Sequence, residues 1–453
     1  MRTMLGAHHW LKRFYLRFTF IAQWLFMATL GAWLIYGDPY GLGSASERAG
    51  ERAIYRLVSG QYDSSVSEPN ILVVLFNDRS IDNLYPYLWE SNDWPLAYSD
   101  QVNLLSAIMT HKPMAVFYDV MWMKQRSLDV SYPRAFAKLK AMQEKTLVPL
   151  YFARGTVDSS MDQTVQKEIK QVAQLAVNGW QGEGDLYPLF VAQGSPTAAM
   201  QLYQEYCQKT RCDSNPNNYL APMSVRWNAN PATVMVPHRS QQCRQLGRVF
   251  DVMQRVVMSV VENILPWLEE EESLQLCPPQ RVLYADELMT LVRSPNPQDR
   301  ERVSEMLENT LVLVGGQIEG IHDYVVSPVH GALPGVFFHA MALDNLITFG
   351  DRYTREDDNV DHVNFTIWLF YITLLVAIRN YAHCYPWLIP VNERLWLMSA
   401  IFIVLVLGIV FGLFNYAPSS WISILALGWV GTQLLQQVDE RYGVSEEGDT
   451  HEE

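Results

Sequence analysis

The sequence predicts an α/β extracytoplasmic domain joined to four transmembrane α-helices. The first observation is a strong segregation of apolar residues, which are concentrated at the two ends of the 453-residue chain. The second is a series of short apolar runs in the middle, separated by amphipathic helical segments. This pattern is typical of a buried, partly parallel sheet with helices on both faces. The net charge of −14 gives no electrostatic reason to expect nucleic acid as a partner.

Four segments are apolar enough and long enough to be transmembrane helices: residues 18–36, 362–378, 395–414 and 421–438. A bilayer core of about 30 Å needs about 20 helical residues, because each residue adds about 1.5 Å. The last two segments form one apolar stretch that is too long for a single helix, and residues 415–420, with Pro418, predict an outer turn between them. A cleavable signal peptide is the alternative for the first segment, but its length and its aromatic residues favour an uncleaved anchor.

The distribution of basic residues predicts the orientation of the chain. Residues 1–17 carry four basic residues and no acidic residue, which favours a cytoplasmic N-terminus. Residues 37–361 would then lie outside the cytoplasm. The loop 379–394 and the acidic tail 439–453 would lie inside it. The loop has a weak excess of basic residues, which agrees with this orientation.

The cysteines are distributed in the same way. Cys207, Cys212, Cys243 and Cys277 fall in the outer region, and Cys384 falls in the inner loop. An even number in an oxidising compartment predicts at least one disulfide, and three pairings remain open. A Cys207–Cys212 pair would be awkward if both residues lay on one helix. A metal site is the alternative, but no CxxC or HxxxH spacing accompanies these cysteines.

The first part of the outer domain has the pattern of a βαβ unit. Residues 46–58 have apolar residues at helical spacing, and 71–76 is a continuous apolar run that predicts a buried strand. A helix over 95–110 and a second buried strand at 115–118 follow, and 147–152 is a candidate third strand. A strand, a helix and a strand in succession favour a parallel pair.

The second part begins with an irregular region and ends regularly. Residues 158–280 hold the outer cysteines, scattered prolines and an amphipathic helix over 252–270, so we expect a helical insertion there. After it we expect a strand at 282–284, a helix at 301–309, a strand at 311–314 and a helix at 335–348.

The end of the outer domain also carries a family resemblance. The residues are Leu311-Val312-Leu313-Val314-Gly315-Gly316, Asp323, Ser327-Pro328, Leu333-Pro334-Gly335-Val336, His339-Ala340 and Asp344-Asn345-Leu346. Together they resemble the closing signature of the second class of CHASE domains, which are extracytoplasmic sensory domains of bacteria. Residues 71–76, followed by Asp78-Arg79-Ser80-Ile81, and residues 115–119 are similar to earlier parts of the family pattern. The resemblance covers about residues 45–350.

The resemblance implies a location and a mode of action. Family members often have one span before the domain and three after it, in the inner (cytoplasmic) membrane, with the domain in the periplasm. Many such receptors end in a kinase or cyclase module, whereas this chain stops 15 residues after residue 438. We therefore expect its output in signal transduction to pass through a separate protein partner.

Three aspartates are candidate ligand-binding residues, because each follows a predicted strand: Asp78, Asp119 and Asp323. In open α/β sheets, ligands bind beyond the carboxyl ends of the strands. Carboxylates that converge there could hold a cation or an amine, or accept hydrogen bonds from a sugar, and Arg79 could pair with one of them. The alternative is that each carboxylate caps a helix or a turn.

Other residues are assigned structural roles. Gly315, Gly316, Pro334 and Gly335 are expected in structural turns. The pair Gly315-Gly316 lacks the third glycine and the following helix of a dinucleotide site. His322 and His339 are interpreted as polar packing residues, since no nucleophile motif is near either one.

The expected function is that of a membrane sensory or receptor subunit that recognises a ligand or an envelope partner. The alternative is a structural or assembly subunit of a cell-envelope complex, with the same domain as a docking surface. We expect no enzymatic activity, because the sequence contains no acid/base pair, nucleophile elbow or HExxH motif. No cofactor or metal is expected. The expected partners are the lipid bilayer, an output protein and, as a further candidate, a second copy of the chain.

Overall fold

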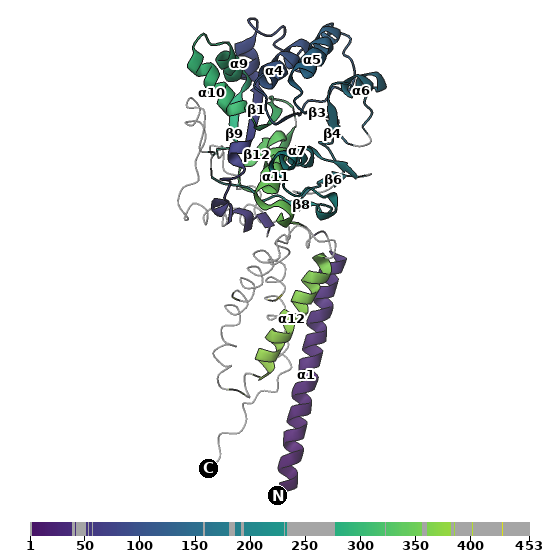
Figure 1. Cartoon of the computed structure of the whole chain (residues 1–453). Coiled ribbons are helices and arrows are strands. Elements are labelled where there is room, and N and C mark those ends of the chain that lie inside the picture. Colours follow the sequence, from purple (N-terminus) through teal and green to yellow (C-terminus); the bar gives the residue numbers. More distant parts are fainter. Residues whose placement is uncertain are drawn as a thin grey trace. The chain divides into compact units, whose positions relative to one another are not determined.

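The computed structural model describes residues 2–38, 58–156, 159–180, 186–191, 194–230, 277–321, 323–355 and 360–381, with a few further positions between and beyond these ranges (Figure 1). The chain divides into two compact units. One consists of Met1–Ile54 with Asp357–Glu453, and the other is Tyr55–Glu356.

The centre of the unit Tyr55–Glu356 is a six-stranded sheet in which every neighbouring pair of strands is parallel. In spatial order the strands are β4 (Gln174–Ala176), β3 (Leu150–Ala153), β2 (Ala115–Tyr118), β10 (Leu311–Gln317), β1 (Ile71–Asn77) and β9 (Arg281–Tyr284). The predicted class, an α/β domain with a buried parallel sheet, is confirmed.

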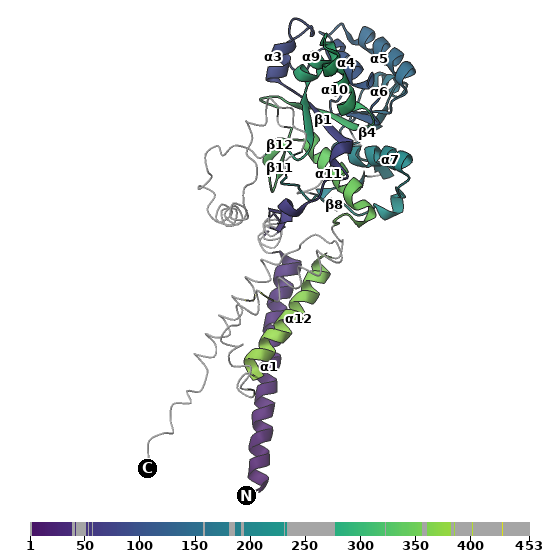
Figure 2. The same cartoon turned by 60° about the vertical axis from the view of Figure 1, so that its left-hand side comes forward.

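Helices cover both faces of the sheet (Figure 2). One face is covered by α3 (Asp78–Leu84), α4 (Tyr98–Met109), α5 (Tyr132–Thr146), α6 (Gln163–Ile169), α9 (Ala285–Arg293) and α10 (Pro297–Leu307). The other face is covered by α7 (Ala198–Thr210) and α11 (Val336–Phe349). Alternate residues of a strand point to opposite faces. Leu72 and Val74 of β1 therefore join the first core, and Ile71 and Val73 join the second.

The handedness of the connections explains this distribution of helices. The steps from β1 through β2 and β3 to β4, and the step from β9 to β10, all run in one direction across the sheet. Right-handed crossovers then place all their helices on one face. The return from β4 to β9 runs in the opposite direction and carries α7 on the other face. Among the strands of this sheet, β10 comes last in the sequence but lies between β2 and β1.

The region 158–280 is less separate from the sheet than the sequence indicated, because it supplies the edge strand β4. The sequence did not predict β4, which has only three residues and an exposed Gln174 at its start. The helix expected over 252–270 lies outside the described residues. The remaining short elements are η2 (Ser59–Gln61), η3 (Glu68–Asn70), η5 (Pro216–Asn218), η7 (Gly350–Arg352), β5 (Leu186–Tyr187), β6 (Phe190–Val191), β7 (Ser195–Pro196), β8 (Met223–Ser224), β11 (Tyr324–Ser327) and β12 (Gly331–Pro334).

Capping residues set the start of α10, which was expected at residue 301. The side chain of Asn296 accepts a hydrogen bond from the backbone N–H of Gln298, and Pro297 occupies the first helical position. Both features favour the start of a helix. The helix therefore begins at Pro297.

The other unit contains α1 (Arg2–Gly37) and α12 (Val360–Tyr381), which pack as an antiparallel pair. The side-chain amide of Asn380 donates to Oε1 of Gln23 over 2.7 Å at one end of the pair. Tyr36 and His362 are joined by a hydrogen bond of 2.9 Å at the other end. Between them, the indole N–H of Trp368 donates to the backbone oxygen of Met27.

Within the described part of the chain, two helical stretches are apolar and long enough to cross a membrane, Phe20–Gly37 and Asp361–Tyr381. They coincide with the first two predicted spans. The predicted spans 395–414 and 421–438 lie outside the described residues, apart from Ile401 and Gly428. Gly428 is helical, and a Cβ atom placed on it would lie 2.5 Å from the hydroxyl oxygen of Tyr371 on α12.

Candidate functional site

Polar side chains meet beyond the carboxyl ends of β2, β3 and β4. Asp119 directly follows β2, and its Oδ1 accepts a hydrogen bond of 2.8 Å from the side-chain amide of Asn178, which follows β4. The oxygen of that amide accepts a hydrogen bond of 2.7 Å from the backbone N–H of Gly155, which follows β3. Asn178 thus fixes the carboxylate of Asp119 relative to two neighbouring strand ends.

His339, in the first turn of α11, completes this cluster from the second face of the sheet. Its Nε2 lies 3.9 Å from Oδ2 of Asp119, and the two side chains are 5% and 4% exposed. Its Nδ1 is hydrogen-bonded to the hydroxyl of Tyr187 over 2.7 Å. The oxygen of that hydroxyl accepts a hydrogen bond from the backbone N–H of Ala199, in the first turn of α7. The rings of Phe117 and Trp180 pack edge-on against the imidazole.

Burial changes the ionisation of these groups. It raises the pKa of Asp119 to about 6, although the hydrogen bond from Asn178 opposes the rise. Burial lowers the pKa of His339 to about 4, against the attraction of Asp323. It also raises the pKa of Tyr187. At neutral pH the cluster therefore contains an ionised Asp119 and a neutral imidazole.

Asp323 belongs to the same cluster and reaches the surface. Its pKa is raised by burial of the carboxylate and by the negative charge of Asp119. The residue as a whole is exposed, but its Oδ1 lies so close to Gly335 that a Cβ atom there would be 2.5 Å away. The backbone N–H of Gly335 also donates to the backbone oxygen of Asp323 over 2.9 Å. A side chain at residue 335 would therefore displace the carboxylate of Asp323 from this position.

Asp78 and Arg79 lie apart from this cluster. Both are exposed in the first turn of α3, and Oδ2 of Asp78 accepts a hydrogen bond of 2.9 Å from the backbone N–H of Glu319. β10 lies between the strands that precede Asp78 and Asp119. The structure thus brings Asp119 and Asp323 together and gives Asp78 a contact with the loop after β10.

The residues expected in turns have more specific positions. Gly315 and Gly316 lie inside β10 rather than in a turn. A Cβ atom on Gly315 would lie 2.5 Å from Cβ of Val336, and one on Gly316 would lie 2.9 Å from the ring of Phe76. These glycines allow close packing of a helix and a neighbouring strand. Pro334 ends β12, and Gly335 precedes α11.

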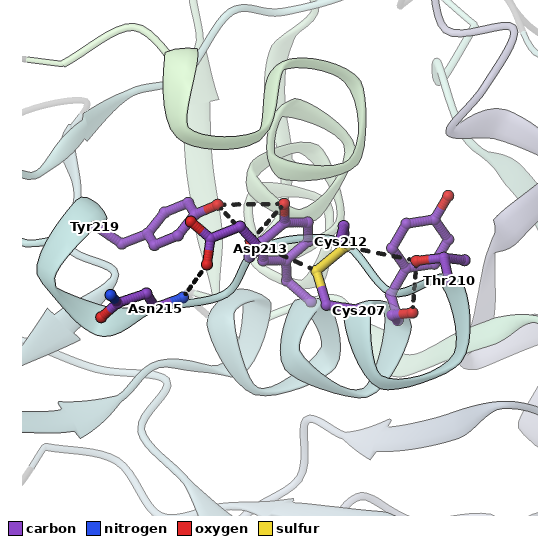
Figure 3. Close-up of a disulfide and its surroundings, with 8 residues drawn as sticks. Cys207, Thr210, Cys212, Asp213, Asn215 and Tyr219 are labelled. Atoms are coloured by element: carbon purple, nitrogen blue, oxygen red, sulfur yellow. Dashed lines mark hydrogen bonds between the residues drawn. A yellow bond between two sulfur atoms is a disulfide. The ribbon is translucent and has the colours of Figure 1, made fainter.

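Cys207, in the last turn of α7, forms a disulfide with Cys212, which follows the helix (Figure 3). The helix ends before Arg211, which has a left-handed conformation with φ of 61°. The chain then reverses, so Cys212 returns to Cys207 with a Cα–Cα distance of 4.5 Å. Cys277 is disulfide-bonded as well. Cys243, Cys384 and His322 lie outside the described residues, within which no group of metal-ligating side chains is found.

Sequence reasoning missed Asn178 and Tyr187, which hold Asp119 and His339. Asn178 follows the unpredicted strand β4, and Tyr187 belongs to the two-residue strand β5. Neither lies in a recognisable motif. The one available signal was His339 itself, which is part of the closing signature.

The family model of the CHASE2 domain matches residues 41–378. This match covers most of the chain, and the protein belongs to the CHASE2 family. CHASE2 is a family of extracytoplasmic sensor domains found in signalling proteins, so the class of protein is sensory. No curated protein and no solved structure matches the chain.

Proposed function

We propose that this protein is a receptor subunit of the bacterial inner membrane. In this proposal its CHASE2 domain lies in the periplasm and recognises a ligand or an envelope partner. Four spans anchor the chain, and the response passes to a separate output protein rather than to an enzymatic activity of the chain itself. The observation that carries the proposal is the cluster of Asp119, Asp323 and His339 at the carboxyl edge of the sheet.

The position of α11 supports the proposal. This helix carries His339 in its first turn, and the chain continues from its end through η7 to α12, a candidate membrane span. A ligand that changes the contacts of His339 would therefore act on the helix that precedes a span. Coupling of this kind needs differential contacts of the ligand with two states of the protein.

The test is co-purification of the full chain in detergent, with mass spectrometry of bound proteins and small molecules. We expect a compound or a protein to be retained by the wild type and lost in Asp119→Ala. Asp78→Ala should retain it, because Asp78 lies at the same edge of the sheet but outside the cluster. Equal retention by both variants would contradict a site at Asp119.

The location of the domain is tested separately. Ser160 is exposed, so Ser160→Cys should react with a membrane-impermeant maleimide in spheroplasts. Protection of this residue, with labelling of the C-terminal tail instead, would contradict the proposed orientation.

The alternative of an assembly subunit is favoured by exposed apolar side chains beyond the same strand ends. Leu128 and Val130 are 97% and 82% exposed. Their loop is held to the loop before α4, because the guanidinium of Arg126 donates to the backbone oxygens of Pro95 and Leu96. A partner protein that is retained by Asp119→Ala but lost in Leu128→Asp would support this role.

A further inference from the structure

Two polar atoms face each other in the cluster without a hydrogen bond in the described part of the structure. They are Oδ2 of Asp119 and Nε2 of His339, at a distance of 3.9 Å. This distance is too long for a hydrogen bond. Both side chains are more than nine-tenths buried, and polar atoms in such surroundings are normally satisfied.

Tyr187 and Asp119 together favour one tautomer of His339. The backbone N–H of Ala199 can only donate to the hydroxyl oxygen of Tyr187. The hydroxyl keeps its own proton, which it can donate to Nδ1 of His339, its other partner. The negative charge of Asp119 beside Nε2 favours the same tautomer of the neutral imidazole, in which Nε2 carries the hydrogen and points a donor at the carboxylate.

Oδ2 of Asp119 is an acceptor and Nε2–H of His339 is a donor, 3.9 Å apart. A group that bridges them must therefore be able to donate to the first and accept from the second. An oxygen atom can lie about 2.8 Å from both atoms at once. A hydroxyl satisfies both, because it accepts from Nε2–H and donates to the carboxylate. An ammonium has no acceptor for Nε2–H, and a carboxylate would be repelled by Asp119. The described residues also provide no group of ligands for a metal ion.

Asp323 and Trp180, which lie beside the Asp119–His339 pair, could contact further parts of a ligand that carries the bridging hydroxyl. The carboxylate of Asp323 is close enough for Asp119 to raise its pKa, and it can accept from a second hydroxyl. The half-buried ring of Trp180 lies beside His339, with 6.2 Å between the ring centroids. Sites for small molecules combine such apolar aromatic surface with a few placed polar groups.

We infer that the ligand of the Asp119–His339 pair is a neutral polyhydroxyl compound, a monosaccharide or a cyclitol, with one hydroxyl bridging Oδ2 of Asp119 and Nε2 of His339. This inference rests on the proposed ligand-sensing function. It names the ligand class of the same site.

Saturation-transfer NMR on the full chain tests the inference. The protein is placed in nanodiscs without glycolipids or sugar detergents, so that no other carbohydrate is present. The probes are a neutral set (glucose, galactose, mannose and myo-inositol) and an amine set (ethanolamine and putrescine). We expect transfer to at least one neutral probe and to neither amine.

Matched variants test whether the neutral probe binds at Asp119 and Asp323. Asp119→Asn and Asp323→Asn should weaken binding of the neutral probe by about ten- to one-hundred-fold, the effect of losing a hydrogen bond to a charged group. Asp323 is at the surface, so its variant keeps the test valid if Asp119→Asn does not fold. Asp78→Asn, at the same edge of the sheet, should bind as the wild type does.

Each other outcome overturns the inference. Transfer to the amines that is lost in Asp119→Asn would show a cation site, and the sensory proposal would stand. Transfer to no probe would show that the pair holds only water. Neutral binding that is unchanged in both variants would place the sugar elsewhere. The co-purification experiment decides the proposed function independently of these results.

Discussion

The hydroxyl of Tyr62 donates a hydrogen bond of 2.7 Å to Oδ1 of Asp344, and both residues are buried. Ser67 donates to the same oxygen over 2.8 Å. Asp344 lies on α11, whereas Tyr62 and Ser67 lie in the segment that leads into β1. One carboxylate therefore ties the segment before the sheet to the helix that follows it.

We expect Asp344→Ala to destabilise the domain strongly. The substitution leaves the buried hydroxyl of Tyr62 without its acceptor, at a cost of about 1–3 kcal/mol. The hydroxyl of Ser67 loses its bond to Asp344 but keeps the backbone oxygen of Ser64 as an acceptor. Thermal unfolding of the full chain measures the effect. Asp82→Ala, at an exposed position on α3, is the control and should change the unfolding temperature little. Similar melting of both variants would contradict a structural role for this carboxylate.

The contribution of Asp344 to stability should rise as the pH falls from 7 towards 4. Burial raises the pKa of Asp344 to about 6, so the folded state holds a proton that the unfolded state releases above pH 3.8. The stabilisation is complete below pH 3.8 and is lost as the pH rises through 6, with a total of about 3 kcal/mol. His339 contributes the opposite slope below pH 6.5, because its pKa is lowered to about 4.

Asp344→Asn isolates the contribution of Asp344, since His339 and Asp119 remain in both proteins. The variant should lack the increase in stability that Asp344 contributes between pH 6 and 4. The measurement is the unfolding temperature of both proteins across this range. Parallel curves would show that Asp344 keeps its ordinary pKa.

Asp78→Ala should reduce stability modestly. The carboxylate of Asp78 lies in the first turn of α3 and accepts from the backbone N–H of Glu319. Loss of such a hydrogen bond costs about 0.5–1.5 kcal/mol. Arg79→Ala, at the exposed neighbouring position, is the control. A ligand that raises the unfolding temperature of the wild type should raise that of Asp78→Ala as well. If the ligand no longer raised the unfolding temperature of this variant, Asp78 would be part of the binding site.

Gly31→Leu should separate α1 from α12. A Cβ atom on Gly31 would lie 1.9 Å from Nε1 of Trp368, so a leucine fits only if the buried ring of Trp368 or the helices move. Cysteines placed at Gln23 and Asn380 should form a cross-link in the parent protein and lose it in Gly31→Leu. Gly37→Leu is the control on the same helix, because its nearest contact, with the ring of Trp33, is 3.5 Å away.

Much of the fold could be predicted because the central strands are apolar on both faces. The runs 71–76, 115–118 and 311–314 became β1, β2 and β10 for this reason. The order of the strands could not be predicted. The insertion of β10 between β1 and β2 depends on contacts far apart in the sequence, and it separates Asp78 from Asp119.

The disulfide shows how a local conformation overrides a spacing argument. Cys207 and Cys212 would be badly placed on one continuous helix. The left-handed conformation of Arg211 ends the helix between them, and no glycine marks this position in the sequence. A non-glycine residue with positive φ is uncommon, so the reversal could not be expected from the residue type.

The central place of β10 has a consequence for the synthesis of the protein. β1 emerges from the ribosome early, but its partners β9 and β10 lie more than two hundred residues later in the chain. Until β10 is made, β2 and β1 each lack a neighbour, and the sheet exists as separate parts with open edges. Pairings between distant segments form slowly, and unpaired strand edges favour aggregation. A chain truncated before residue 311 should therefore be a target for chaperones and proteases, even though most of the domain has been synthesised.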